Sequence, residues 1–458
     1  MSSSRMRFGS HAYLRAKPVF VLITILAVSP VHSEQAKIPD TAAGRVLAAW
    51  LEAFNSGDRV RIGAYRQEYE PTSDLPLDAM MAFRARTGGF ELVGLQKSEP
   101  LYVEFLVKER ASDTRAIGRF EVTRSDPPKV TTSGLNVIPA GTEVIGFAID
   151  AATRERVIAG SITKLNENYV FPETAKKMEQ ALRRHQKRGE YDSVTDGEKF
   201  ATLLTTHLQE VSHDKHLRVN FRVVRFPDDL AAPGPQQEAE NRRMTERVNC
   251  GFEKVELLAG NVGYVKFNMF ANPAQCGETA IAAMNFLANA DAIVFDLRDN
   301  GGGDPAMIAL ISTYLFDQPT HLNDIWNRKA GTTQQYWTLP VVPGKRLSAA
   351  PAFVLTSSRT FSGAEEFSYN LKNLKRATIV GETTGGGAHP VRGERIDDRF
   401  MIGVPFARAI NPITKTNWEG TGVEPDVKVP AADALATAQK LAAEKLVPGS
   451  SAPRAITN

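Results

Sequence analysis

The sequence has 458 residues, 42% of them hydrophobic, and its 55 Lys and Arg residues against 52 Asp and Glu residues give a net charge of +3. This apolar fraction can fill hydrophobic cores and excludes wholesale disorder, and the length predicts two or three domains at roughly 100–200 residues per domain. Two cysteines are too few for a disulfide-dense scaffold or a four-thiolate metal site.

Residues 1–33 have the pattern of a signal peptide. Basic residues precede an apolar run over residues 18–30, and Ser33 offers a small residue for cleavage. The run is shorter than the roughly 20 residues that a membrane span needs, and an uncleaved anchor is the alternative. We therefore expect a secreted or periplasmic protein with no stable membrane span after cleavage. In that oxidising compartment Cys250 and Cys276 either pair or remain as buried thiols.

Residues 40–138 are predicted to form a small α+β accessory domain. Asp40 or Thr41 can cap a first helix that stops at residues 55–58. A second helix is expected over residues 77–86, followed by strands over 90–96, 101–108 and 116–123. Helices followed by a curved sheet, together with the phrase AFNSGD (53–58), resemble the nuclear-transport-factor-two-like cone fold.

Residues 145–225 are predicted to form a helical subdomain. Amphipathic helices are expected over residues 151–182 and 196–210, with a break at NENYVFPE (166–173), and a strand over 217–224. Residues 226–248 are polar and rich in Pro, Gln and Glu, which is typical of a surface excursion or lid.

Residues 250–446 alternate between strand and helix, which predicts a layered α/β core with βαβ units. We expect residues 447–458 to be disordered. The predicted strands are 262–267, 291–296, 352–356 and 377–381, and the predicted helices are 274–287, 305–315, 361–372 and 431–446.

The segment TSSRTFSGAEEF (356–367) places Ser362 at the start of a helix, directly after a strand of the buried type. Unpaired N–H groups and the positive end of the helix dipole favour negative charge there. Ser362 can then present its hydroxyl oxygen to a substrate carbonyl while the N–H of Gly363 helps to hold the oxyanion. The alternative is that Ser362 is only a helix cap, with Glu365 completing a capping box.

The segment DLRDNGGGD (296–304) follows a second strand with three consecutive glycines. Glycine lets the backbone approach a ligand closely. The N–H of Gly301 or Gly302 is therefore a candidate second oxyanion donor. A phosphate-binding P-loop is disfavoured because no Gly-Lys-Ser/Thr follows.

These two segments, together with RATIVGETTGGGAHP (376–390) and WEGTGVEPDV (418–427), resemble the tail-specific, or C-terminal processing, serine peptidases. They are also similar to tricorn protease and to the modules of interphotoreceptor retinoid-binding protein. The resemblance covers roughly residues 150–445. It implies a crotonase- or ClpP-like core, a peptide or protein substrate and no cofactor.

The general base is where this chain departs from the processing peptidases. The position of their catalytic lysine falls on Gly387 here. The segment VSHDKHLRV (211–219) resembles the histidine motif of the tricorn branch instead, which makes His216 the candidate base. That branch also implies a carboxylate that helps to orient the histidine, for which Glu419 is the candidate and Glu424 the runner-up.

His213 and His389 are competing candidates for the base, and His389 lies near the position of the missing lysine. The cluster SHDKH also suggests a metal site built from His213, Asp214 and His216, but its spacing is not the usual helical zinc spacing, and we expect no metal. Basic residues lack interleaved aromatic residues, so nucleic-acid binding is unsupported.

The leading hypothesis is an exported serine peptidase. The alternatives are a non-catalytic ligand- or peptide-binding module of the same fold and a serine esterase that is not a peptidase.

Overall fold

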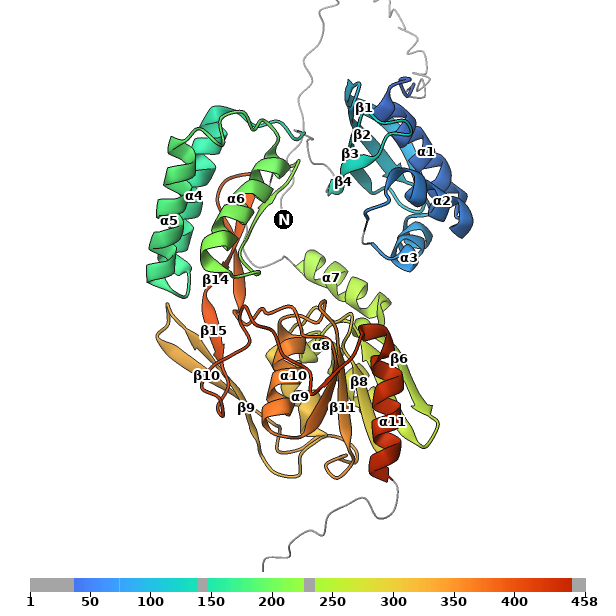
Figure 1. Ribbon diagram of the computed structural model, residues 1–458, viewed down its shortest axis with the longest axis vertical. Helices are drawn as coiled ribbons and strands as arrows, with labels where there is room; N and C mark the ends of the chain where they lie inside the picture. The colour runs from blue at the N-terminus through green and yellow to red at the C-terminus, as the bar shows by residue number, and fades with distance from the viewer. Residues whose placement is uncertain (1–36, 74, 139–145, 226–234, 447–458) are drawn as a thin grey trace, which may run out of the picture. The chain divides into compact units, whose positions relative to one another are not determined.

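The computed structural model describes residues 37–73, 75–138, 146–225 and 235–446 (Figure 1). The predicted signal peptide and the predicted disordered tail both lie outside these residues. The chain divides into two units, with the boundary near Ser133, and each unit is described by itself.

The first unit contains helices and an antiparallel sheet, as predicted. Helix α1 begins after Thr41, whose side chain accepts a hydrogen bond from the N–H of Gly44, and it ends at Gly57 with a left-handed φ of +67°. The predicted second helix and three strands are confirmed, whereas α2 and β4 were not expected. The helices are α1 (Ala42–Ser56), α2 (Arg59–Tyr69) and α3 (Leu77–Thr87), and the strands are β1 (Phe90–Glu99), β2 (Tyr102–Glu109), β3 (Arg115–Val122) and β4 (Val130–Ile138).

The order of these strands is β1-β2-β3-β4. Trp50 of α1 packs against aromatic rings from α1 and three strands, with ring centroids between 5.6 and 5.7 Å apart. The helix therefore covers one face of the sheet through a single aromatic core.

The second unit is built around a six-stranded sheet in the order β16-β12-β11-β8-β7-β6. Only β6 pairs antiparallel, with β7, and the other neighbours are parallel. The predicted strands β7, β11 and β12 have the expected bounds. The strands are β6 (Phe252–Leu258), β7 (Val262–Phe267), β8 (Ala292–Asp296), β11 (Ala352–Thr356), β12 (Ala377–Gly381) and β16 (Val427–Lys428).

Helices cover both faces of this sheet (Figure 1). Alternate side chains of β8, such as Ile293 and Val294, point into different clusters, so that one face packs against three helices and the other packs against α11. This is the mixed α/β architecture that the sequence predicts. The helices are α8 (Pro273–Phe286), α9 (Pro305–Thr313), α10 (Gly363–Asn373) and α11 (Ala434–Leu446).

The helical subdomain consists of α4 (Ala151–Asn168), α5 (Pro172–Lys187) and α6 (Gly197–Ser212). The predicted break at NENYVFPE separates α4 from α5, where Pro172 occupies the first turn of α5. Strand β5 (Arg218–Phe221) follows α6 and pairs antiparallel with β14 (Phe400–Pro405), with Val219 opposite Ile402. The apolar core of the three helices includes Ile402, so the subdomain is joined to the α/β core by pairing and packing.

Two further strand groups complete this unit. Strand β14 also pairs with β13 (Val391–Arg395), and a separate sheet has the order β10-β9-β15. Its strands are β9 (His321–Asn327), β10 (Thr332–Trp337) and β15 (Ala407–Ile410). Within the predicted polar excursion, Pro235–Arg247 forms helix α7, and residues 226–234 lie outside the described residues.

Cys250 and Cys276 form a disulfide that links the segment before β6 to α8. Of the two alternatives that the sequence left open, the paired state is the one found. Among the described residues, we find no helix with both the length and the apolar character that crossing a membrane requires.

Candidate active site

Ser362 lies at the start of α10, at the carboxyl edge of the parallel strands. It is the N-cap residue of α10 and has a φ of +53°, a left-handed value that residues other than glycine rarely adopt. The carboxylate of Glu365 accepts a hydrogen bond from the N–H of Ser362 at 2.8 Å, as the capping interpretation predicts. Ser362 is therefore held in a conformation of the kind that clusters at functional sites.

Glu365 connects Ser362 to a second segment of the site. Its buried carboxylate also accepts hydrogen bonds from Thr384 Oγ1 and from the N–H groups of Gly386 and Gly387, at 2.5, 2.6 and 2.8 Å. Burial raises the pKa of Glu365, and these hydrogen bonds oppose the shift. One side chain thus fixes the nucleophile candidate relative to the glycine-rich turn after β12.

The glycine turn after β8 packs against the start of α10. A Cβ on Gly302 would come 2.5 Å from the nitrogen of Gly363, so only glycine allows this approach. The N–H of Gly301 donates to the carbonyl of Asn268 at 3.1 Å, and the N–H of Gly302 donates to Asn300 Oδ1 at 2.8 Å. Both N–H groups are therefore engaged within the turn.

Gly303 is the third member of this turn. Within the part of the chain that the structure describes, we find no hydrogen-bond acceptor for the N–H of Gly303 or of Gly363. A Cβ on Gly363 would come 2.8 Å from the nitrogen of Gly303, so the two backbone nitrogens lie close together. Both residues line the same cavity as Ser362.

This cavity has a volume of about 450 Å³. Two imidazoles, His216 and His389, form part of its wall together with Ser362. The cavity therefore gathers a hydroxyl nucleophile, two candidate proton acceptors and two backbone donors, which are the groups that acyl transfer requires.

His216 reaches the cavity from the segment between α6 and β5. Its ring packs against Phe361, the residue before Ser362, with 4.7 Å between ring centroids. Its backbone N–H donates to Asp214 Oδ1 at 3.0 Å, and its Nδ1 lies 3.9 Å from the same oxygen. Burial lowers the pKa of His216 and the charge of Asp214 opposes this shift. A neutral imidazole can accept a proton at physiological pH.

His389 lies on the other side of the same carboxylate. Its Nδ1 lies 2.7 Å from Asp214 Oδ2 and 3.4 Å from Glu419 Oε2. Asp214 is fully buried and also accepts a hydrogen bond from the hydroxyl of Tyr169 at 3.3 Å. Asp214 therefore stands between the two histidines.

Glu419 is next to His389, and the carboxylate that faces His216 is Asp214. Burial raises the pKa of Glu419 to about 7, the charge of Asp214 adds to this shift, and His389 opposes it. The N–H of Ala388 donates to Glu419 Oε2 at 2.5 Å. The structure thus brings Glu419 to the site but not into contact with the histidine that the sequence prediction assigned to it.

The remaining predicted residues lie outside the cavity. His213 is exposed at the end of α6, and Glu424 and Gly301 are exposed as well. Asp214 enters the sequence predictions only as a metal ligand. Its signal is the spacing Asp-x-His in SHDKH, which places a carboxylate beside the ring of His216.

Among the residues that the structure describes, two clusters contain enough carboxylate and imidazole groups to hold a metal ion: Asp214, His389 and Glu419, and His185, Glu190 and His207. In the first cluster, the donors already named engage both oxygens of Asp214 and Oε2 of Glu419, whereas Glu419 Oε1 is buried without a partner among the described residues. We therefore interpret it as a hydrogen-bonded network.

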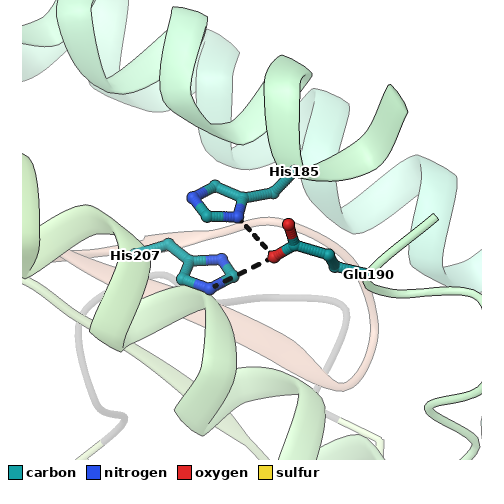
Figure 2. Close-up of side chains that lie close together, drawn as sticks. All are labelled: His185, Glu190 and His207. Atoms are coloured by element: carbon teal, nitrogen blue, oxygen red, sulfur yellow. Dashed lines mark hydrogen bonds and ion pairs between the residues drawn. The ribbon is translucent and has the colours of Figure 1, made fainter. Parts of the chain in front are cut away.

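Figure 2 shows the second cluster, between α5 and α6. Glu190 Oε2 lies 2.6 Å from His185 Nδ1 and 3.9 Å from His207 Nε2. The two rings stack 3.5 Å apart at 9°, so no ion can lie in both ring planes, where the nitrogen lone pairs point. The cluster therefore fits a carboxylate shared by two imidazoles better than a metal centre.

Comparison with known proteins gives one consistent family. Residues 261–429 match the model of peptidase family S41, and residues 151–258 match the model of the N-terminal domain of this family in eukaryotic interphotoreceptor retinoid-binding protein.

A carboxyl-terminal-processing protease of Picosynechococcus sp. is 30% identical over 191 residues, 41% of this chain and 44% of that protein. The chloroplastic carboxyl-terminal-processing peptidase 1 of Arabidopsis thaliana is 29% identical over 189 residues, 41% of this chain and 37% of that protein. The chain thus spans less than half the length of these relatives. The crystal structure of a candidate peptidase from Parabacteroides merdae aligns with a TM-score of 0.47 and 17% identity, over 66% of this chain and 99% of that one.

Proposed function

Residues 151–429 carry the domains of peptidase family S41, and from this premise we propose that the protein is a serine peptidase in which Ser362 is the nucleophile. The observation that carries the proposal is the cavity whose wall includes Ser362, His216 and the two residues whose N–H groups have no acceptor among the described residues, Gly303 and Gly363. Its substrates are peptides or proteins, and no cofactor takes part.

His216 is the general base in this proposal. Its ring packs against Phe361, the residue before Ser362, and burial lowers the pKa of His216, which favours the neutral imidazole. A base must lie within hydrogen-bond reach of the proton that it removes. His389 is the competing base, because it lines the same cavity and contacts the same buried carboxylate.

Asp214 orients His216 in place of Glu419. An acid that accepts a hydrogen bond from Nδ1 fixes the tautomer in which Nε2 is free to accept a proton, and it stabilises the imidazolium that forms. The 3.9 Å gap between His216 Nδ1 and Asp214 Oδ1 must close for this bond to form, and such bonds often tighten only when substrate binds. Glu419 then helps to orient His389, whose Nδ1 lies 3.4 Å from Glu419 Oε2.

Gly363 and Gly303 supply the oxyanion hole. Gly301 and Gly302 are unsuited to donate because their N–H groups already have acceptors within the turn. The N–H groups of Gly303 and Gly363 remain available where negative charge develops on the carbonyl oxygen.

The reaction proceeds in two halves. Ser362 Oγ attacks the peptide carbonyl while His216 takes its proton, and the resulting oxyanion is held by the two N–H groups. His216 then gives the proton to the leaving amine, which leaves an acyl-enzyme on Ser362. Water, deprotonated by His216, attacks the ester, and the carboxylic acid product leaves with Ser362 protonated again.

Three further expectations belong to the same proposal. Residues 1–33 direct export to a secreted or periplasmic location, which the basic and apolar pattern of this segment supports. The core of parallel strands and covering helices is of the crotonase or ClpP type. The first unit is an accessory domain of the nuclear-transport-factor-two-like type.

The test is labelling with a fluorophosphonate probe, which reacts covalently with activated serines. We expect the wild-type protein and Ser358→Ala to be labelled equally and Ser362→Ala to remain unlabelled. Ser358 is a matched control because it is exposed in the same loop. Absence of labelling in the wild-type protein would favour the binding-module alternative, and equal labelling of all three proteins would refute the assignment of Ser362.

A further inference from the structure

Glu366 is a buried carboxyl group in the wall of the same cavity, and the mechanism above does not use it. It lies four residues after Ser362, one turn along α10, and its relative exposure is 4%. Its Oε1 is buried and has no hydrogen-bond partner among the described residues. Its neighbour Glu365, by contrast, has its oxygens satisfied by four donors.

The surroundings of Glu366 are acidic and polar. No lysine or arginine belongs to the described lining of the cavity, and Glu366 is its only carboxylate. Asp304, the cap of α9, adds a second negative charge nearby, and the Asn323 side chain also interacts with Glu366. Both polar atoms of the Asn323 side chain are buried and unpaired among the described residues.

A buried carboxyl group without a partner costs free energy that a bound cation would offset. Burial raises the pKa of Glu366 to about 8, and Asp304 adds to this shift while Asn323 opposes it. A basic group that enters the cavity would favour the ionised form of Glu366 and form a charge-assisted hydrogen bond. The chemistry of this wall therefore favours a ligand that carries an ammonium or guanidinium group.

We propose that Glu366 makes this cavity selective for peptides with a lysine or arginine side chain at the residue whose carbonyl Ser362 attacks. The position follows from the cavity: Ser362 and Glu366 both line it, so a long side chain extending from the acyl carbon at Ser362 can reach Glu366 within the same space. The unpaired oxygen of Asn323 offers a further acceptor to a guanidinium group, which carries five donors. The inference rests on the proposed function because it assigns the substrate of that same site.

The first experiment compares fluorogenic peptides that differ only in the residue before the scissile bond: arginine, lysine, glutamine or leucine. We expect kcat/KM for the basic peptides to exceed that for leucine by at least about tenfold in the wild-type protein. Glu366→Gln should abolish this preference while it still cleaves the leucine and glutamine peptides. Glu278→Gln, on the exposed face of α8, is the matched control and should behave like the wild type.

A second measurement does not depend on peptide cleavage. N-butylguanidine should slow fluorophosphonate labelling of Ser362 in the wild type, whereas its neutral counterpart N-butylurea should not, and Glu366→Gln should lose this protection. Glu366→Met serves as a second variant, and thermal unfolding verifies that each variant is folded.

The two proposals fail in different ways. A wild-type protein that is neither labelled nor active refutes the proposed function. Labelling or cleavage without a preference for basic residues and without protection by butylguanidine refutes the role of Glu366 alone. A preference that persists in Glu366→Gln refutes it as well.

Discussion

The buried carboxylate of Asp214 lies 2.7 Å from Nδ1 of His389. Its other oxygen faces His216, so that one acid serves two imidazoles at the edge of a single cavity. Because Asp214 contacts both histidines, it links them in one polar network. Substitutions at each histidine can then show which of the two acts as the base.

Replacing each histidine by glutamine should show which of the two contributes more to catalysis. We expect His216→Gln to lower kcat/KM by about 10³-fold, within the range that general-base catalysis contributes. His389→Gln should cost about tenfold, because it disturbs only the orientation of Asp214. Steady-state kinetics on a fluorogenic peptide measures both effects, and circular dichroism establishes that both variants are folded. The reverse ranking would make His389 the base.

Asp214→Asn should change the pH profile as well as the rate. Burial lowers the pKa of His216, and the charge of Asp214 raises it. Removing the charge of Asp214 should therefore lower the pKa of His216 further. The acid limb of kcat/KM should therefore lie below the ordinary histidine range of about 6.5 in the wild type and move to still lower pH in the variant.

The same pH profile is recorded for Glu419→Gln. The pKa of Glu419 is raised to about 7, so its titration would otherwise overlap with that of His216. A limb that stays in place or moves to higher pH in Asp214→Asn would argue against the role of Asp214.

Two glycines of one turn should respond differently to alanine. Gly303 has a φ of +144°, and a Cβ there would overlap with the carbonyl of Phe270. We expect Gly303→Ala to lower the free energy of unfolding by at least about 2 kcal/mol. Gly301 is exposed, and a methyl group added there would meet no atom within 4 Å, so Gly301→Ala should stay within about 0.5 kcal/mol of the wild type. Urea denaturation compares the two variants.

Glu366→Gln should stabilise the protein in a manner that depends on pH. Burial raises the pKa of Glu366 from 4.5 to about 8, so folding favours its protonated form, and its contribution to stability falls as pH rises through this window. The advantage of the variant should be absent below about pH 4.5 and reach a few kcal/mol above about pH 8.

Denaturation at pH 4, 6 and 8.5 measures this advantage. Asp304 and Tyr336 interact with Glu366 and are unchanged in the variant, so the two proteins differ only at residue 366. A stability difference that is equal at every pH would contradict the prediction.

Loss of the disulfide should destabilise the second unit. Cys250 and Cys276 are separated by 26 residues, and closing a loop of that length stabilises a fold by about 3 kcal/mol through the unfolded state. We expect the double variant Cys250→Ser/Cys276→Ser to lose about that amount in denaturant unfolding. Reduction of the wild-type protein should reproduce the loss without further effect on the double variant.

The core strands were predictable because most of their residues are buried and apolar. The sequences of β7, β11 and β12 are short apolar runs bounded by turn residues, and their bounds match the predictions. Helix α2 was not predicted because only Ile62 and Tyr65 are buried along it, which leaves almost no periodic signal.

Local motifs suggest Ser362 and His216 as candidates, and the spacing Asp-x-His also places Asp214 near His216, whereas the other contacts of the candidate site depend on long-range packing. Asp214 and His389 are 175 residues apart in sequence, and no local pattern states that this carboxylate also meets His389. The three glycines of the turn look equivalent in sequence. Only the acceptors supplied by Asn268 and Asn300 distinguish Gly303 from Gly301 and Gly302.

The pairing of β5 with β14 also has a consequence for the order of events during synthesis. The histidine-bearing segment before β5 leaves the ribosome well ahead of β14, which begins at Phe400. Until β14 exists, β5 lacks the strand that holds it, and the residues on its two sides cannot converge on Ser362. The candidate site therefore comes together only after the segment that forms β14 has been synthesised.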